Sequence, residues 1–132
     1  MKYLIDTHVL LWVLFEPARI SAHARRIIEN PESDVHVSAL SFWEISLKFQ
    51  IGKLELNNCV PDDLPVQVER MGIEIFQMDA GLLSSSYRLP LDKHKDPFDR
   101  LLAWHAIQKG MILITKDKAF DEYLSTGLKT VW

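Results

Sequence analysis

Four acidic residues are candidates for chemistry because folding stability alone gives little reason to place them where they stand. Each falls at the end of an expected helix or strand or on a core-facing surface: Asp6, Glu44, Asp99 and Asp117. If the fold brings them together, their carboxylates form a cluster that requires cations. Oxygen ligands of this kind suit Mg²⁺ or Mn²⁺, which activate water and stabilise the charge that develops during phosphodiester cleavage.

The elements that must position these residues follow an α/β pattern, in which short apolar runs alternate with helical segments. Strands are expected at 2–6, 35–38 and 111–115, a weaker one at 73–77 and an edge strand at 129–132. Helices are expected at 7–15, 21–30, 39–51, 62–71, 80–87, 97–109 and 118–124, and a surface loop at 88–96. Parallel strands carry ligand sites beyond their carboxyl ends, so Asp6 and Asp117 share one rim if their strands are neighbours.

Helix capping is the alternative interpretation for the residues that follow strands. It applies to Asp117 and, less well, to Asp6, since Thr7 could cap the first helix by itself. Asp96 is expected to cap the helix that begins at Pro97, which leaves Asp99 in the first turn, where the helix dipole favours an acid. Asp96 is therefore assigned a structural role as a helix cap. Asp99 is either an acid favoured by the helix dipole or a member of the carboxylate cluster.

Glu44 interrupts the apolar stripe of its helix, which it shares with Leu40, Leu47 and Ile51. A buried carboxylate needs a partner, a proton or a cation. A capping box from Ser41 to Glu44 would also explain the residue, but Ser38 directly follows a strand and is the more natural cap.

Composition narrows the class of protein. The chain has 132 residues, 48% of them hydrophobic, and a net charge of −3, which together predict one globular domain over residues 1–132 and argue against a polycationic nucleic-acid coat. The single cysteine, Cys59, allows no internal disulfide, and no apolar run is long enough for a membrane span. A cytoplasmic protein without a membrane role is expected. Zinc, nucleotide-binding and serine-hydrolase motifs are absent from the sequence.

The sequence resembles the PIN domain family and, within it, the VapC-like toxin ribonucleases. The resemblance spans nearly the whole chain and rests on four segments in order: Leu4-Ile5-Asp6-Thr7-His8, Ser41-Phe42-Trp43-Glu44-Ile45, Asp96-Pro97-Phe98-Asp99-Arg100-Leu101-Leu102 and Thr115-Lys116-Asp117. It implies a three-layer α/β sandwich with a central, mainly parallel sheet of about five strands flanked by helices. One departure is His105, where similar proteins often have Gln.

The resemblance also implies a metal-dependent endoribonuclease that is the toxin of a toxin–antitoxin pair. Its acidic quartet falls on Asp6, Glu44, Asp99 and Asp117, which would bind Mg²⁺ or Mn²⁺. Thr7 and Thr115 match hydroxyl positions that line such a site. The expected partners are an RNA substrate, an antitoxin whose C-terminal segment lies along the active-site groove, and a second copy of the chain.

Several basic residues are candidates for contacts with RNA phosphates, although each can equally be solvated surface: Arg88, Lys93, Lys95, Arg100 and Lys116. Asp121 is a substitute for the fourth carboxylate. Two other functions stay open at this point: a catalytically inactive binding module with the same fold, and a small Mg²⁺-dependent phosphatase. The latter usually has Asp-x-Asp after the first strand, where this chain has Asp6-Thr7-His8.

Overall fold

A computed structural model of the chain describes residues 1–91, 93 and 95–132. Its helices are α1 (Thr7–Phe15), α2 (Ala22–Glu29), α3 (Ala39–Gln50), α4 (Leu64–Arg70), α5 (Ala80–Ser85) and α6 (Pro97–Lys109). Short 3₁₀ helices are η1 (Pro17–Arg19), η2 (Pro61–Asp63), η3 (Ser86–Arg88) and η4 (Lys118–Thr126). The strands are β1 (Lys2–Ile5), β2 (Asp34–Ser38), β3 (Glu74–Phe76), β4 (Ile112–Ile114) and β5 (Lys129–Val131). Two residues of the expected surface loop, Asp92 and His94, lie outside the described residues.

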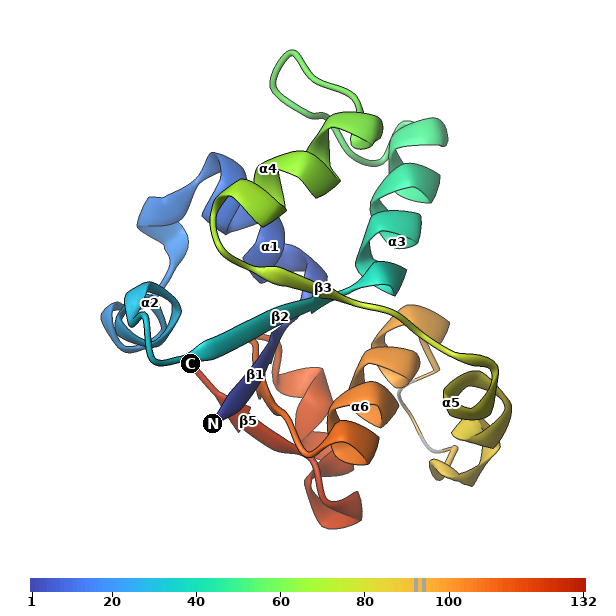
Figure 1. Cartoon of the computed structure of the whole chain (residues 1–132). Helices are drawn as coiled ribbons and strands as arrows, with labels where there is room; N and C mark the ends of the chain where they lie inside the picture. Colours follow the sequence, from blue (N-terminus) through green and yellow to red (C-terminus); the bar gives the residue numbers. More distant parts are fainter. Residues whose placement is uncertain (92, 94) are drawn as a thin grey trace.

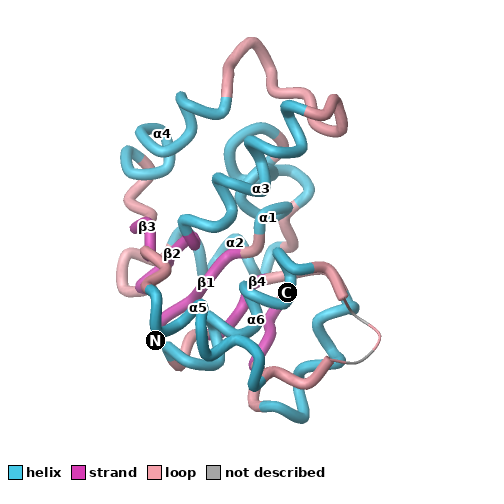
Figure 2. The backbone as a smooth tube through the Cα atoms, turned by 90° about the vertical axis from the view of Figure 1, so that its right-hand side faces the viewer, coloured by secondary structure: helices cyan, strands magenta, loops and turns pink. Residues whose placement is uncertain are grey.

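The described strands form one sheet in the order β3-β2-β1-β4-β5, and every neighbouring pair is parallel. Figure 1 shows α1, α2 and α4 on one side of this sheet and α5 and α6 on the other. Figure 2 shows α3 and α4 above the strands and away from α5 and α6. This confirms the expected three-layer α/β fold, with a fully parallel sheet.

Two apolar clusters fill the space between the layers. One joins β1 and β4 to α5, α6 and η4, and includes Leu102, Leu113 and Phe120. The other joins β2 to α1, α3 and α4, and includes Leu10 and Ile45. Burial of these side chains holds both helical layers on the sheet, because removing apolar surface from water drives the packing. The sheet and the helix ends behind it therefore form a rigid support.

Local signals set the helix boundaries. Ser38 caps α3 by accepting from the Leu40 amide at 3.1 Å, as expected, so Glu44 belongs to no capping box. Gly110 ends α6 in the left-handed conformation, with φ of 64°, which glycine adopts without steric cost. The expected helix at 118–124 is instead the 3₁₀ helix η4, so this prediction was wrong in type, though not in position.

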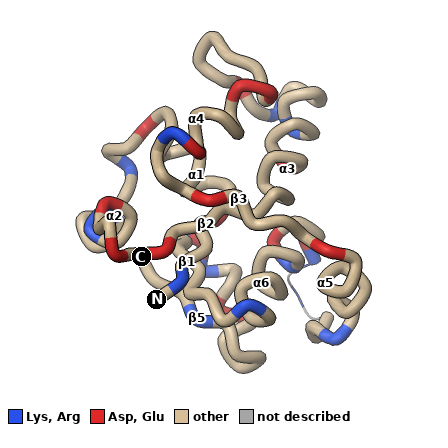
Figure 3. Tube along the Cα trace, in the orientation of Figure 1, with Lys and Arg blue, Asp and Glu red and all other residues tan. Residues whose placement is uncertain are grey.

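Figure 3 shows Lys and Arg dispersed among Asp and Glu over the elements visible in that view. Within the described residues, no helix combines the length and the apolar character that a membrane crossing requires.

Candidate active site at the carboxyl ends of the strands

The site lies where the strand order changes direction. The chain proceeds from β1 to β2 on one side of β1 and later returns to β4 on the other, so β1 and β4 are adjacent. Ligand sites of open parallel sheets form at such points, just beyond the strand ends. Asp6 directly follows β1, and its amide donates to the Ile114 carbonyl of β4 at 3.2 Å. The condition for Asp6 and Asp117 to share one rim, that these two strands are neighbours, is therefore met.

Asp6 uses both of its carboxylate oxygens. Oδ1 accepts from the Val9 amide at 2.7 Å and so caps α1, while Oδ2 accepts from the Thr115 hydroxyl. Thr7 is inside the helix, so the expectation that it could serve as the cap was wrong. Burial raises the pKa of Asp6 above its ordinary value, and the charge of Asp117 acts in the same direction. The hydrogen bonds from Thr115 and Val9 oppose this rise.

Glu44 is buried, with 3% of its surface exposed, and it has polar partners on both oxygens. Thr7 Oγ1 donates to Oε1 at 2.7 Å, and Lys48 Nζ lies 2.5 Å from Oε2. Ser41 extends this network through a 2.9 Å hydrogen bond to Thr7 Oγ1. The partner that a buried carboxylate requires is therefore Lys48, one helical turn away. Sequence reasoning missed Lys48, although its spacing of four residues from Glu44 is a recognisable signal.

Asp117 caps η4 by accepting from the Ala119 amide at 2.9 Å, so the interpretation of Asp117 as a helix cap is confirmed. Its own amide donates to Thr115 Oγ1 at 3.0 Å, and Thr115 in turn donates to Asp6. Thr115 thus connects the two acids across the β1 and β4 ends. Asp121, the substitute fourth carboxylate, is exposed on η4.

Asp99 lies in the first turn of α6, and Asp96 caps that helix by accepting from the Phe98 and Asp99 amides at 2.9 and 3.3 Å. The Trp43 and Phe98 rings, each one residue before an acid of the quartet, pack edge to face with centroids 5.1 Å apart. This contact brings the start of α6 beside α3. Burial acts to lower the pKa of Lys48, but Glu44, with Asp96 and Asp99, raises it overall.

Asp6, Glu44 and Asp117 lie around the ends of β1 and β4, and Asp99 lies in the first turn of α6, without converging on a single point. In the part of the chain that the structure describes, no three of them bring ligand atoms within 4.8 Å of one another. Asp6, Glu44 and Asp117 instead accept hydrogen bonds from the residues around them. Mg²⁺ commonly binds through one or two carboxylates and retains several waters, so this rim suits it without full convergence.

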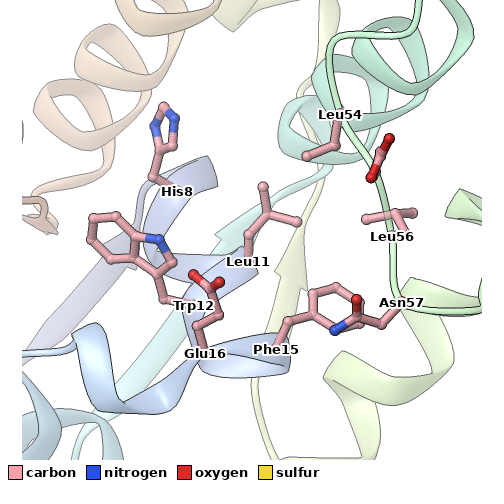
Figure 4. Close-up of a pocket in the computed structure, with 9 residues that line it drawn as sticks. His8, Leu11, Trp12, Phe15, Glu16, Leu54, Leu56 and Asn57 are labelled. Atoms are coloured by element: carbon pink, nitrogen blue, oxygen red, sulfur yellow. The ribbon is translucent and has the colours of Figure 1, made fainter.

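A groove extends from Glu44 along α1. A cavity of about 270 Å³ is lined by residues that include Thr7, Glu44 and Lys48. A second, of about 240 Å³, shares His8, Leu11 and Leu54 with the first and continues to Phe15 and Glu16. Figure 4 shows Leu11 and Phe15 of α1 pointing toward Leu54, Leu56 and Asn57 across this second cavity. The groove has a mixed lining, with apolar side chains such as Leu11 and Leu54, and the Glu44 and Lys48 pair at the end nearest the rim.

The basic candidates differ in their surroundings. Arg100 donates from both terminal nitrogens, at 2.9 Å each, to the carbonyls of Leu89 and Pro90. Its guanidinium therefore holds the chain segment that follows η3. Lys93, Lys95 and Lys116 are exposed. Arg88 is exposed as well, with its guanidinium 5.9 Å from the Tyr87 ring.

The chain thus has a parallel α/β sheet with acidic residues at the strand ends where the strand order changes direction. This arrangement is typical of α/β proteins whose site can bind a metal ion. The sequence matches the PIN domain family over residues 3–123, and the chain belongs to that family. It is similar to Ribonuclease VapC22 of Mycobacterium tuberculosis, with 29% identity over 134 residues that cover 98% of this chain and 97% of that protein.

Two solved structures show the same fold. One is VapBC2 from Rickettsia felis bound to a DNA fragment from its promoter, with a TM-score of 0.72, 17% identity, and coverage of 99% of this chain and 98% of that chain. The other is VapBC-1 from nontypeable Haemophilus influenzae, with a TM-score of 0.66, 15% identity, and coverage of 99% and 97%.

Proposed function

We propose that this protein is a Mg²⁺- or Mn²⁺-dependent endoribonuclease and the toxin of a toxin–antitoxin pair. One observation carries the proposal: two threonine hydroxyls, Thr115 and Thr7, hold Asp6 and Glu44 at the rim of the sheet. Membership of the PIN domain family and the ribonuclease similar to this chain support the reaction class. The toxin role is supported by similarity to VapBC structures.

The proposed ligands have distinct roles. Asp6 and Asp99 bind the ion directly, Glu44 binds the same ion or a second one, and Asp117 binds directly or through water. All four offer hard oxygen donors, which Mg²⁺ and Mn²⁺ prefer. When bound, the ion supplies water activation and neutralises charge at the scissile phosphate.

The protein's own contribution is to fix these oxygens before substrate arrives. Asp6 is anchored by the Val9 amide and the Thr115 hydroxyl, so its carboxylate cannot rotate freely. Lys48, which is partly exposed, balances the charge of the buried Glu44. Rigid helix starts at Asp6 and Asp96 keep the acids in place, which favours catalysis because little reorganisation is needed.

RNA would approach along the exposed basic residues near the rim. Arg88, Lys93, Lys95 and Lys116 are proposed to contact phosphates, which supply affinity without sequence information. Arg100 is assigned mainly to loop support because its guanidinium already donates to two backbone carbonyls.

The groove along α1 is the proposed position for the C-terminal segment of an antitoxin. The apolar side chains of Leu11 and Phe15 in its lining suit a segment with hydrophobic residues. A homodimer is also proposed, on the family resemblance alone.

The test is cleavage of RNA by purified protein, started with Mg²⁺ and stopped with EDTA. Asp6→Asn and Asp99→Asn are expected to abolish cleavage, while Glu69→Gln, which changes an exposed acid on α4, retains it. Asparagine keeps the capping function of Asp6, so Asp6→Asn is expected to fold. Full activity of Asp6→Asn would reject the site. Absence of both cleavage and Mg²⁺ binding in the unmodified protein would favour a non-catalytic binding module.

A further inference from the structure

A second group of potential ligands lies away from the acidic rim, toward the starts of β2 and β3. The parallel register places His36 beside Glu74, and Asp34 precedes His36 by two residues on the same face of β2. One ligand atom from each of these side chains lies within 4.8 Å of the other two. Among the residues that the structure describes, no other group of three His, Cys, Asp or Glu side chains has this property.

His36 gives a second, independent indication of a ligand. Its surface is 5% exposed, and neither ring nitrogen makes a hydrogen bond within the described residues. Nε2 lies 2.8 Å from Asp34 Oδ1 and Nδ1 lies 3.7 Å from Glu74 Oε2, so each nitrogen faces a carboxylate without a directed bond. A buried ring nitrogen is normally satisfied, and a bound cation would satisfy one here.

The surroundings leave room for an ion. An open cavity of about 380 Å³ is lined by residues that include Asp34, His36, Glu74 and Lys2. The side chains of Asp34 and Glu74 are 42% and 74% exposed, so their carboxylates can move by rotation about side-chain bonds. Ligand atoms around one Zn²⁺ lie roughly 3.3 Å apart. Because one ion binds one ring nitrogen, an ion at Nε2 beside Asp34 requires the exposed Glu74 side chain to turn from Nδ1 toward that nitrogen.

We propose that Asp34, His36 and Glu74 bind a divalent transition-metal ion, with Zn²⁺ as the representative, at a site separate from the nuclease rim. One imidazole and two carboxylates are a ligand set that Zn²⁺ accepts, whereas Mg²⁺ prefers oxygen ligands alone. Three protein ligands leave a position for water. The ion would join β3, an edge strand of the sheet, to β2. This inference does not depend on the proposed nuclease activity.

The experiment is a Zn²⁺ titration of the full chain at pH 7.5 in excess Mg²⁺, which competes for sites made of oxygen ligands alone. Calorimetry measures the affinity, and NMR of the imidazole nitrogens reports which histidine binds. We expect a shift of one His36 ring nitrogen and an increase in melting temperature. Asp34→Asn and Glu74→Gln are each expected to weaken binding at least tenfold, and neither replaces a buried side chain. Glu69→Gln, an exposed change on α4, is the matched control.

Asp6→Asn separates the two sites, because it is expected to abolish RNA cleavage and leave Zn²⁺ binding at His36 unchanged. Zn²⁺ binding that is lost in Asp6→Asn but retained in Glu74→Gln would overturn the proposal. Unshifted His36 nitrogens at saturating Zn²⁺ would also overturn it and would leave His36 as an ion-pair partner of two carboxylates.

Discussion

Thr115 donates a hydrogen bond to Asp6 from the end of the neighbouring strand, although 109 positions separate the two residues. The same hydroxyl oxygen accepts from the Asp117 amide at 3.0 Å. Thr115 therefore fixes the relative position of two of the four rim acids, and it does so from a strand end that is itself held by sheet pairing.

The first prediction concerns this hydroxyl. Thr115→Val keeps the shape of the side chain but removes the donor to Asp6, so the Asp6 carboxylate loses its orientation. Residues that orient metal ligands commonly contribute 10- to 100-fold, and we expect about a tenfold rise in the Mg²⁺ concentration required for half-maximal RNA cleavage. Thr115→Ser, which retains the hydroxyl, is the control. Equal Mg²⁺ dependence for Val and Ser would show that the hydroxyl does not act on the site.

The second prediction concerns the Glu44 and Lys48 pair. Lys48→Met leaves the buried Glu44 carboxylate without its cation, and we expect a loss of about 1–2 kcal/mol in unfolding free energy, discounted because Lys48 is partly exposed. Adding Glu44→Gln should recover part of this loss, since the unpaired charge is then gone. Urea denaturation of both single variants and the double variant measures the coupling. Additive effects would contradict the pairing.

The features that were predictable from the sequence are those with local causes. Ser38 and Asp96 cap their helices by bonds to amides two or three residues away, and Gly110 ends a helix through its own backbone freedom. Apolar runs also identified each described strand to within two residues at either end. The four-residue spacing of Glu44 and Lys48 also indicated that these side chains meet on one helix face, but the contact was not predicted.

The features that escaped prediction depend on strand order and register. Nothing in the sequence aligns His36 with Glu74, because that neighbour is set by the pairing of β2 with β3. The 3₁₀ form of η4 was also not predicted, because local helical preference does not separate this form from an α-helix. The shared rim of Asp6 and Asp117 was expected only on the condition that β1 and β4 were neighbours.

The third prediction is a pH dependence of stability due to His105. Burial lowers the pKa of this ring from 6.5 to about 4, with the charges of Lys109 and His36 adding to the effect and that of Asp79 opposing it. Between pH 6.5 and about 4 the unfolded chain binds a proton at this ring and the folded chain does not. The stability that the neutral His105 contributes is therefore complete above pH 6.5, and it is lost as the pH falls toward 4. The expected loss is up to ~3 kcal/mol.

His105→Gln should flatten this dependence because glutamine does not titrate. Urea midpoints measured between pH 4 and 7 for the unmodified protein and the variant provide the comparison. His23→Gln, at an exposed position on α2, is the control and should preserve the slope. An unchanged slope in His105→Gln would mean that other groups produce the acid destabilisation.

The last prediction assigns the role of Asp117, which is both a helix cap and a proposed ligand. Asparagine caps helices about as well as aspartate, so Asp117→Asn should keep the melting temperature within a degree or two. Loss of the charge should nevertheless lower RNA cleavage by about tenfold, less than in Asp6→Asn, because Asp117 is exposed and more peripheral. Asp117→Ala removes both functions and should lower stability as well as activity. If Asp117→Asn cleaves RNA at the unmodified rate while Asp117→Ala is unstable, Asp117 serves only as the cap of η4.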